Sequence, residues 1–173
     1  MLCRRDLLIC CLHFSVVLSR SFDVNCIASC GDPSVDALAR VVFGEARGEP
    51  YVGQLAVAYT VVNRVRHEAY PSSVAAVLAA TWGSQKRHEY ETLDIPSHDV
   101  AFNDAKQQLN KEFLSAVMAA REALCACAPD PTGCAVSFCA GAGCLQDNSY
   151  YIATNKIQIG NHNFACRVKA SGK

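Results

Sequence analysis

Apolar residues recur at helical spacing in the first part of the chain after residue 30. They are Val35, Leu38, Ala39 and Val42. Asp32 followed by Pro33 is a favourable helix start, and Gly48 is typical of a helix end, where a left-handed residue closes the last turn. The pattern predicts a helix over residues 33–47. One more step of three residues along its apolar face reaches Glu45, so this carboxylate is expected on the inward side of the last turn.

The next segment, residues 52–67, is apolar on almost every side, which is typical of a helix buried in the centre of a domain. Gln54 and Asn63 are polar exceptions within it and need buried hydrogen-bond partners. We expect these two side chains to belong to a network that orients Glu45.

The remaining pattern is shorter and less regular. It predicts a short helix over residues 72–80, a long exposed loop over 81–102, and a long helix that Asn103 or Asp104 caps and whose firm part is 113–124. Short β-prone runs separated by glycine and asparagine follow. They are residues 135–138, 150–152 and 157–159. The predicted fold class is α+β, mainly α, with one helical domain and a small β element.

Composition excludes several classes of protein. The chain has 173 residues, of which 51% are hydrophobic and 18% charged, so a folded single domain is expected. Sixteen basic residues balance sixteen acidic ones, which argues against a nucleic-acid partner. No glycine-rich phosphate loop, nucleophilic serine motif or metal-binding motif is present, so we expect no cofactor and no metal.

The first twenty residues resemble a secretory signal. Arg4 and Arg5 precede an apolar run over residues 7–18, and small Ser19 and Ser21 follow. The run is shorter than the roughly 20 residues of a spanning helix, although an uncleaved anchor is the alternative. We therefore expect a secreted protein, without stable membrane insertion after cleavage, whose mature part is residues 21–173.

Eight of the eleven cysteines lie beyond this segment. They are Cys26, Cys30, Cys125, Cys127, Cys134, Cys139, Cys144 and Cys166. An even set in an exported chain predicts disulfides that staple the fold, with a pairing that spacing alone does not give. A zinc site is the alternative, because some of these cysteines form close pairs.

The predicted position of Glu45 has chemical consequences. Burial and the negative end of a helix both disfavour a carboxylate anion and raise the pKa of the group. A carboxylic acid that stays protonated near neutral pH can act as the general acid on a glycosidic oxygen. The alternative is a structural ion pair between Glu45 and Arg40 or Arg64.

The segment "LARVVFGEARGEPYVGQLAVAYTVVNRV", residues 38–65, resembles the signature of the spore-cortex-lytic cell-wall hydrolase family, which is SleB-like. The later elements "AAREAL", "DPTGCA" and "IGNHNF" fit in order, so the resemblance covers about residues 34–165. It implies a lysozyme-like fold that cleaves the glycan strands of peptidoglycan. It also implies that Glu45, the first glutamate of the Glu-Ala-Arg-Gly-Glu motif, is the catalytic acid.

Glycosidases usually need two carboxylates, and the sequence offers Glu49 as the second. A lytic transglycosylase needs only one carboxylate, so we expect cleavage by a single glutamate. We also expect the protein to be a monomer. The candidate substrate-binding residues are Glu49, Asn63, Trp82, Tyr90, Tyr151 and His162, with Trp82 and Tyr90 expected on an exposed loop. The segments "TWGSQKRHEYE" and "AVSFCAGAGC" depart from the family pattern and leave the substrate less certain than the acid. A disulfide-stapled lectin without turnover and a cysteine-rich matrix protein are the competing functions.

Overall fold

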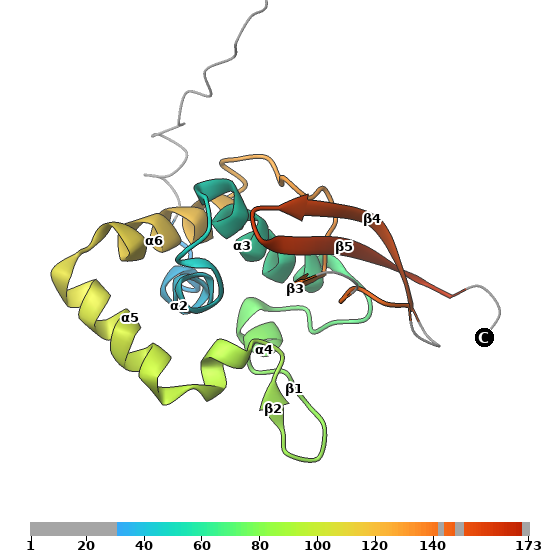
Figure 1. Ribbon diagram of the computed structural model, residues 1–173, viewed down its shortest axis with the longest axis horizontal. Helices are drawn as coiled ribbons and strands as arrows, with labels where there is room; N and C mark the ends of the chain where they lie inside the picture. Colours follow the sequence, from blue (N-terminus) through green and yellow to red (C-terminus); the bar gives the residue numbers. More distant parts are fainter. Residues whose placement is uncertain (1–30, 142–143, 148–150, 171–173) are drawn as a thin grey trace, which may run out of the picture.

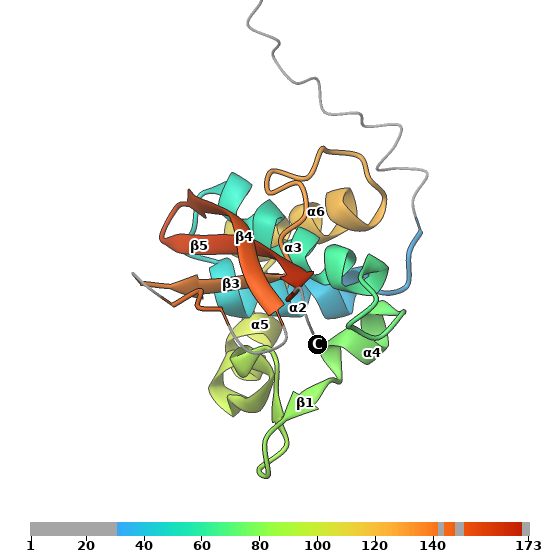
Figure 2. The same cartoon turned by 90° about the vertical axis from the view of Figure 1, so that its right-hand side faces the viewer.

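The computed structural model describes residues 31–141, 144–147 and 151–170. A body of helices lies beside an antiparallel sheet, and a small hairpin projects from the body in both views (Figures 1 and 2). The helices are α2 (Val35–Ala46), α3 (Tyr51–Arg66), α4 (Val74–Leu78), α5 (Pro96–Gln108), α6 (Lys111–Leu124) and the short 3-10 helix η1 (Glu91–Asp94). The strands are β1 (Thr81–Trp82), β2 (Arg87–His88), β3 (Ser137–Ala140), β4 (Tyr151–Ile159) and β5 (His162–Lys169). The predicted α+β, mainly helical class is confirmed.

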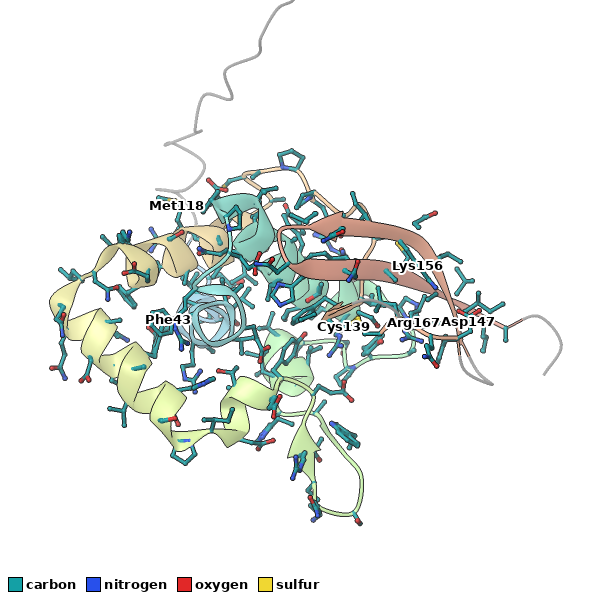
Figure 3. The ribbon with its side chains drawn as sticks, viewed as in Figure 1. Phe43, Met118, Cys139, Asp147, Lys156 and Arg167 are labelled. Carbon is teal, nitrogen blue, oxygen red and sulfur yellow. A yellow bond between two sulfur atoms is a disulfide. The ribbon has the colours of Figure 1, made fainter. Side chains whose placement is uncertain are left out.

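Helices α2, α3 and α6 contact one another and form the core of the helical body. The apolar stripe of α2 is buried as predicted, with Leu38, Ala39 and Val42 each 0% exposed. Phe43, labelled in Figure 3, lies on the side of α2 toward α5, where its ring packs edge-on against Phe102 at 5.6 Å. Helix α3 is buried on nearly all sides, as its uniform apolar pattern predicted.

The sheet has the strand order β3-β5-β4, with both pairs antiparallel. A tight turn at Gly160 and Asn161 joins β4 to β5, and Ile159 pairs with His162 beside it. The predicted runs 150–152 and 157–159 belong to one strand, interrupted by an irregularity between Thr154 and Ile157, while residue 150 lies outside the described part. Strand β5 was not predicted.

Two predictions about the middle of the chain are wrong. Residues 81–102 are not one loop, because they hold the β1–β2 hairpin, η1 and the start of α5 at Pro96. The long helix starting at Asn103 or Asp104 is two helices, α5 and α6. Between them Leu109 adopts a left-handed conformation, with φ of 51°, and Asn110 caps α6 by accepting a hydrogen bond from Phe113 N at 2.9 Å.

The ends of α2 also differ from the prediction. Ser34 occupies the N-cap position, and Asp32 instead accepts a hydrogen bond from Ser34 N at 2.7 Å. The predicted left-handed Gly48 is wrong, because this glycine is not among those with positive φ. The helix closes instead through a hydrogen bond from Glu49 N to Ala46 O at 2.9 Å.

All six cysteines within the described ranges are disulfide-bonded, which confirms the disulfide prediction for these residues. Cys134 is joined to Cys166 and Cys139 to Cys144, and Cys125 and Cys127 are bonded as well. Oxidised sulfurs are not zinc ligands, so the zinc alternative is wrong for these six. Cys26, Cys30 and the expected signal over residues 1–20 lie outside the described residues. No helix in the described part is both long and apolar enough to cross a membrane.

Candidate active site

Glu45 lies in the last turn of α2, as predicted, and its carboxyl group contacts η1. Oε1 accepts a hydrogen bond from the backbone N of Thr92 at 3.0 Å. The contact joins positions 47 residues apart in sequence. Glu45 is therefore held by a backbone amide of a different element, at the edge of the helical body.

The environment raises the pKa of Glu45 above its ordinary value. Burial of the carboxyl group is the largest cause, because it disfavours the charged form, and the negative charge of Glu91 acts in the same direction. The hydrogen bond from Thr92 and the charges of His162 and His98 lower the pKa but do not cancel the effect of burial. Glu45 thus retains its proton to a higher pH than a free glutamic acid.

The two arginines that could have paired with Glu45 have other partners. Arg40 donates to Asp99 Oδ1 at 2.7 Å, and Arg64 donates to Val136 O at 2.8 Å. Arg64 also lies 3.6 Å from the carboxylate of Glu89. The alternative interpretation, a structural ion pair between Glu45 and Arg40 or Arg64, is therefore wrong.

Glu49 lies between α2 and α3 and holds the β4–β5 turn. Its Oε2 accepts from Asn161 N at 2.9 Å and its Oε1 from Asn161 Nδ2 at 3.0 Å. A Cβ atom at Gly160 would lie 2.0 Å from Oε2, so this turn closes on the carboxylate only because residue 160 is glycine. Glu49 is an anion that anchors the hairpin.

The charge state of Glu49 contrasts with that of Glu45. Burial acts to raise the pKa of Glu49, but the two hydrogen bonds from Asn161 and the charge of His162 outweigh it and leave the pKa lowered. The environments therefore move the pKa values of the two glutamates apart, which is the arrangement that assigns an acid and an anion within one site.

His162 begins β5 and acts on both glutamates. Its Nδ1 lies 3.8 Å from Glu49 Oε1, and its charge lowers the pKa of Glu45. The ring packs edge-on against Phe138 at 5.4 Å. The structure therefore brings the predicted residue His162 to the site, fixed by aromatic packing.

Asn63 and Gln54 do not orient Glu45, so that prediction is wrong. Asn63 Nδ2 donates to Asp130 Oδ2 at 2.7 Å and to Ala135 O at 3.1 Å, and so holds the turn before β3. Gln54 Nε2 donates to the carbonyl of Glu49 at 3.1 Å. Polar residues of a buried helix were correctly expected to need partners, but these partners lie elsewhere.

Two of the predicted aromatic residues differ from Trp82 in their surroundings. Tyr90 is 1% exposed and packs against Phe138 and the guanidinium of Arg64, so its predicted exposure is wrong. Tyr151 begins β4, eight residues before the Ile159 end that reaches the site, a distance of about 26 Å along a strand. The ring of Tyr90 is therefore buried, and that of Tyr151 lies at the far end of β4 from His162.

Trp82 is the aromatic residue that remains exposed, at 59%. It lines a hollow together with Arg87, His88, Glu89, Glu91, Asp94 and Ile95. His88 Nδ1 contacts Asp94 Oδ1 at 2.6 Å, which ties the β1–β2 hairpin to η1. Glu91 lines the hollow and also acts electrostatically on Glu45, whereas Glu45 itself is not among the lining residues.

Sequence reasoning missed Thr92, Glu91 and Asn161. Thr92 and Glu91 belong to no motif that identifies them, and only folding brings all three residues to the glutamates. Asn161 lies 112 residues from Glu49. The "IGNHNF" segment was the available signal, since it contains both Asn161 and His162.

Comparisons with known proteins place the chain in a family. The spore cortex-lytic enzyme of Halalkalibacterium halodurans is 44% identical over 54 residues, which are 31% of this chain and 16% of that enzyme. The enzyme of the same name from Bacillus subtilis is 54% identical over 41 residues, 24% of this chain and 13% of that enzyme. The matched segments thus span less than a fifth of these curated relatives.

The solved structure of the catalytic domain of the germination-specific lytic transglycosylase SleB from Bacillus anthracis has a TM-score of 0.51 and 25% identity. The match covers 79% of this chain and 97% of that domain. The family model described as cell wall hydrolase matches residues 48–165. The chain therefore belongs to the cell wall hydrolase family.

Proposed function

We propose that this protein cleaves glycosidic bonds in the glycan strands of peptidoglycan, with Glu45 as the acid and base. One observation carries the proposal: Glu45 is a partly buried carboxyl group with a raised pKa, held in the last turn of α2 by the backbone N of Thr92. The family model begins at residue 48, three residues after Glu45, so the role of this residue rests on its geometry and on its motif. The likeness to a SleB catalytic domain supports the substrate class.

The contacts of Glu49 support a single-glutamate mechanism. Both of its carboxylate oxygens accept hydrogen bonds from Asn161, and its lowered pKa keeps it charged. It is therefore not a proton donor, and its bonds to Asn161 disfavour a role as nucleophile. In this proposal Glu45 performs both proton transfers, as in a lytic transglycosylase.

The reaction then has two balanced steps. Glu45 gives its proton to the leaving oxygen as the bond from the anomeric carbon of N-acetylmuramic acid breaks. The resulting Glu45 carboxylate takes the proton of the 6-hydroxyl group of the same sugar, whose oxygen forms a new bond to the anomeric carbon. The product is a 1,6-anhydro end, no water is consumed, and Glu45 is protonated again.

The hollow that Trp82 and Glu91 line provides the binding surface in this proposal. Trp82 stacks on a sugar face, since exposed aromatic rings combine apolar area with a polar rim. His162 lies close to both glutamates and contacts the substrate or orders the groups around it. Glu49 contributes indirectly, by holding the turn from which His162 extends.

We also propose that the protein is exported and acts as a monomer outside the cell. The six disulfide-bonded cysteines support this location, because disulfides persist in oxidising compartments. The basic and apolar pattern of residues 1–20 supports it independently.

The test is to incubate the purified oxidised protein with peptidoglycan and to measure the soluble muropeptides released. Glu45→Gln keeps an oxygen that can accept from Thr92 N but has no proton to transfer, so the rate should fall by about 10²–10⁴. Thermal stability should hold or rise, because the change removes a carboxyl group that burial destabilises when charged. Glu68→Gln, an exposed glutamate with 75% side-chain exposure, is the matched control and should retain full activity.

Other outcomes separate the competing functions. Binding of wild-type protein to peptidoglycan without release of muropeptides would favour the lectin, and neither binding nor release would favour a matrix protein. An active but destabilised Glu45→Gln would mean that Glu45 is structural.

A further inference from the structure

Thr92, the residue whose amide contacts Glu45, is fixed by an unusual number of contacts. It is 2% exposed. Arg40 donates from Nη1 to Thr92 Oγ1 and from Nη2 to Thr92 O, both at 2.9 Å. Thr92 Oγ1 also lies 2.9 Å from Nδ1 of His98, to which it can donate its own hydrogen. Side chain and backbone of Thr92 are thus held at the same time.

Arg40 is itself well fixed. It is 8% exposed, and its Nε donates to Asp99 Oδ1 at 2.7 Å. Arg40 and Glu45 belong to the same helix, α2. Because Arg40 ties Thr92 to α2, the helix that also carries Glu45, Thr92 and Glu45 are held at a fixed distance from each other.

Gly44 permits the close approach of η1 to α2. A Cβ atom at this position would lie 1.6 Å from Thr92 Oγ1. Any side chain at residue 44 must push Thr92 away, and with it the amide that contacts Glu45. The glycine next to the acid thus belongs to the same arrangement as Arg40 and Thr92.

We propose that Arg40, Gly44 and Thr92 form a positioning unit that reserves Oε1 of Glu45 as a hydrogen-bond acceptor and so assigns the transferable proton to Oε2. The reason is that the carbonyl oxygen of a neutral carboxyl group is a better acceptor for an amide N–H than its hydroxyl oxygen, and the group carries one hydrogen on one of its two oxygens. With Oε1 held by Thr92 N at 3.0 Å, the proton lies on the other oxygen. The importance of this proton position for catalysis rests on the function proposed above. The position of the proton itself does not depend on that function.

Several charged groups face this arrangement and set the expected sign of a perturbation. Glu91 from η1 acts to raise the pKa of Glu45, while His98 from α5 and His162 from β5 act to lower it. Asp99 faces Arg40. The hydrogen bond from Thr92 N lowers the pKa of Glu45, so losing that bond alone should raise it.

The first test uses the unaltered oxidised protein. Nuclear magnetic resonance of the Glu45 side-chain carboxyl carbon and of the Thr92 amide is recorded across pH. The Thr92 amide shift should follow the titration of Glu45 with the same midpoint, and Glu45→Gln should abolish that transition. A Thr92 amide that ignores the titration of Glu45 overturns the proposal, whether or not any variant folds.

The second test uses variants of the unit. Thr92→Val removes the hydroxyl that Arg40 holds and should raise the pKa of Glu45, whereas Thr92→Ser keeps the hydroxyl and should restore it. Gly44→Ala displaces Thr92 without changing any charge and should shift the pKa in the same direction. Thr132→Val removes a hydroxyl that bonds Asp130 at 2.8 Å and is the matched control, expected to leave Glu45 unchanged. An unchanged pKa in folded Thr92→Val overturns the proposal.

Enzyme kinetics separate this proposal from the proposed function. If wild-type protein cleaves peptidoglycan, Thr92→Val should move the alkaline limb of the rate–pH profile to higher pH and lower kcat by about 10- to 100-fold, with little change in KM. A simple loss of stability would not move that limb. If the wild-type protein does not cleave peptidoglycan, the proposed function is wrong. The magnetic resonance experiment then still shows whether Thr92 N is bonded to the Glu45 carboxyl group.

Discussion

Replacing Glu49 with glutamine tests whether this residue is a structural anion. The wild-type carboxylate accepts two hydrogen bonds from Asn161, at 2.9 and 3.0 Å, and its side chain is only 9% exposed. Glutamine has one oxygen and one NH₂ group in place of two acceptors. Both Asn161 donors then lose their charged acceptor, and the Asn161 side chain keeps a partner only by turning over its own amide.

The magnitude follows from the loss of this charged acceptor. A hydrogen bond to a charged group contributes about 1.5–3 kcal/mol to stability. Glu49→Gln should therefore lower the free energy of unfolding at pH 7 by about that amount. For a protein of this length each kcal/mol corresponds to about 2–4 °C, so the unfolding midpoint should fall by about 3–12 °C.

The effect should depend on pH with a definite sign. The folded-state pKa of Glu49 is lowered from its ordinary value of 4.5, so its stabilisation is fully present above that pH and is lost as pH falls through the folded-state value. The difference between wild type and Glu49→Gln should therefore be largest near neutral pH and shrink below pH 4.5.

The assay is thermal unfolding of both proteins by circular dichroism between pH 3 and 8. Glu68→Gln, which removes an exposed carboxylate, should change the free energy of unfolding by less than about 0.5 kcal/mol. A Glu49→Gln protein as stable as wild type at pH 7, or a deficit that persists in full at pH 3, would refute the reasoning.

Three further changes test other parts of the structure. Trp82→Ala should weaken binding of glycan oligomers by about three- to tenfold in a direct binding assay, the loss of one aromatic stacking contact, while the unfolding midpoint stays unchanged because the ring is 59% exposed. Cys134→Ser together with Cys166→Ser should cost about 4 kcal/mol in denaturant unfolding, since the bond closes a loop of 32 residues; an unchanged midpoint would count against a structural disulfide. Gly160→Ala should destabilise about as much as Glu49→Gln in the same unfolding assay, because its Cβ would collide with the Glu49 carboxylate and its φ is 60°; wild-type stability would show that the turn does not close on Glu49.

The elements with a clear period could be predicted from the sequence. Helices α2 and α3 were found within two residues at each end, because their apolar positions report which faces are buried. The start of helix α5 was missed because few residues of this helix are apolar and only Phe102 and Ala105 are buried. Strand β5 was missed because it alternates weakly and its segment was interpreted as a motif.

The sequence predicted a site residue only where the local sequence pattern determines its chemistry. Glu45 follows from its place on a buried stripe at a helix end. Its partner Thr92 and the Asn161 that holds Glu49 are tertiary neighbours, which no local pattern identifies. Tyr90 shows the opposite failure, because a polar surrounding sequence predicted exposure while the folded chain buries its ring.

If Glu45 alone drives cleavage of the glycan strand, the attacking oxygen comes from the sugar and not from water. Mass spectrometry of the soluble fragments that the purified protein releases from peptidoglycan in ¹⁸O-labelled water tests this. We expect 1,6-anhydro ends that carry no ¹⁸O. Reducing ends labelled with ¹⁸O would show attack by water and contradict the single-glutamate mechanism, and the absence of soluble fragments would contradict the enzyme itself.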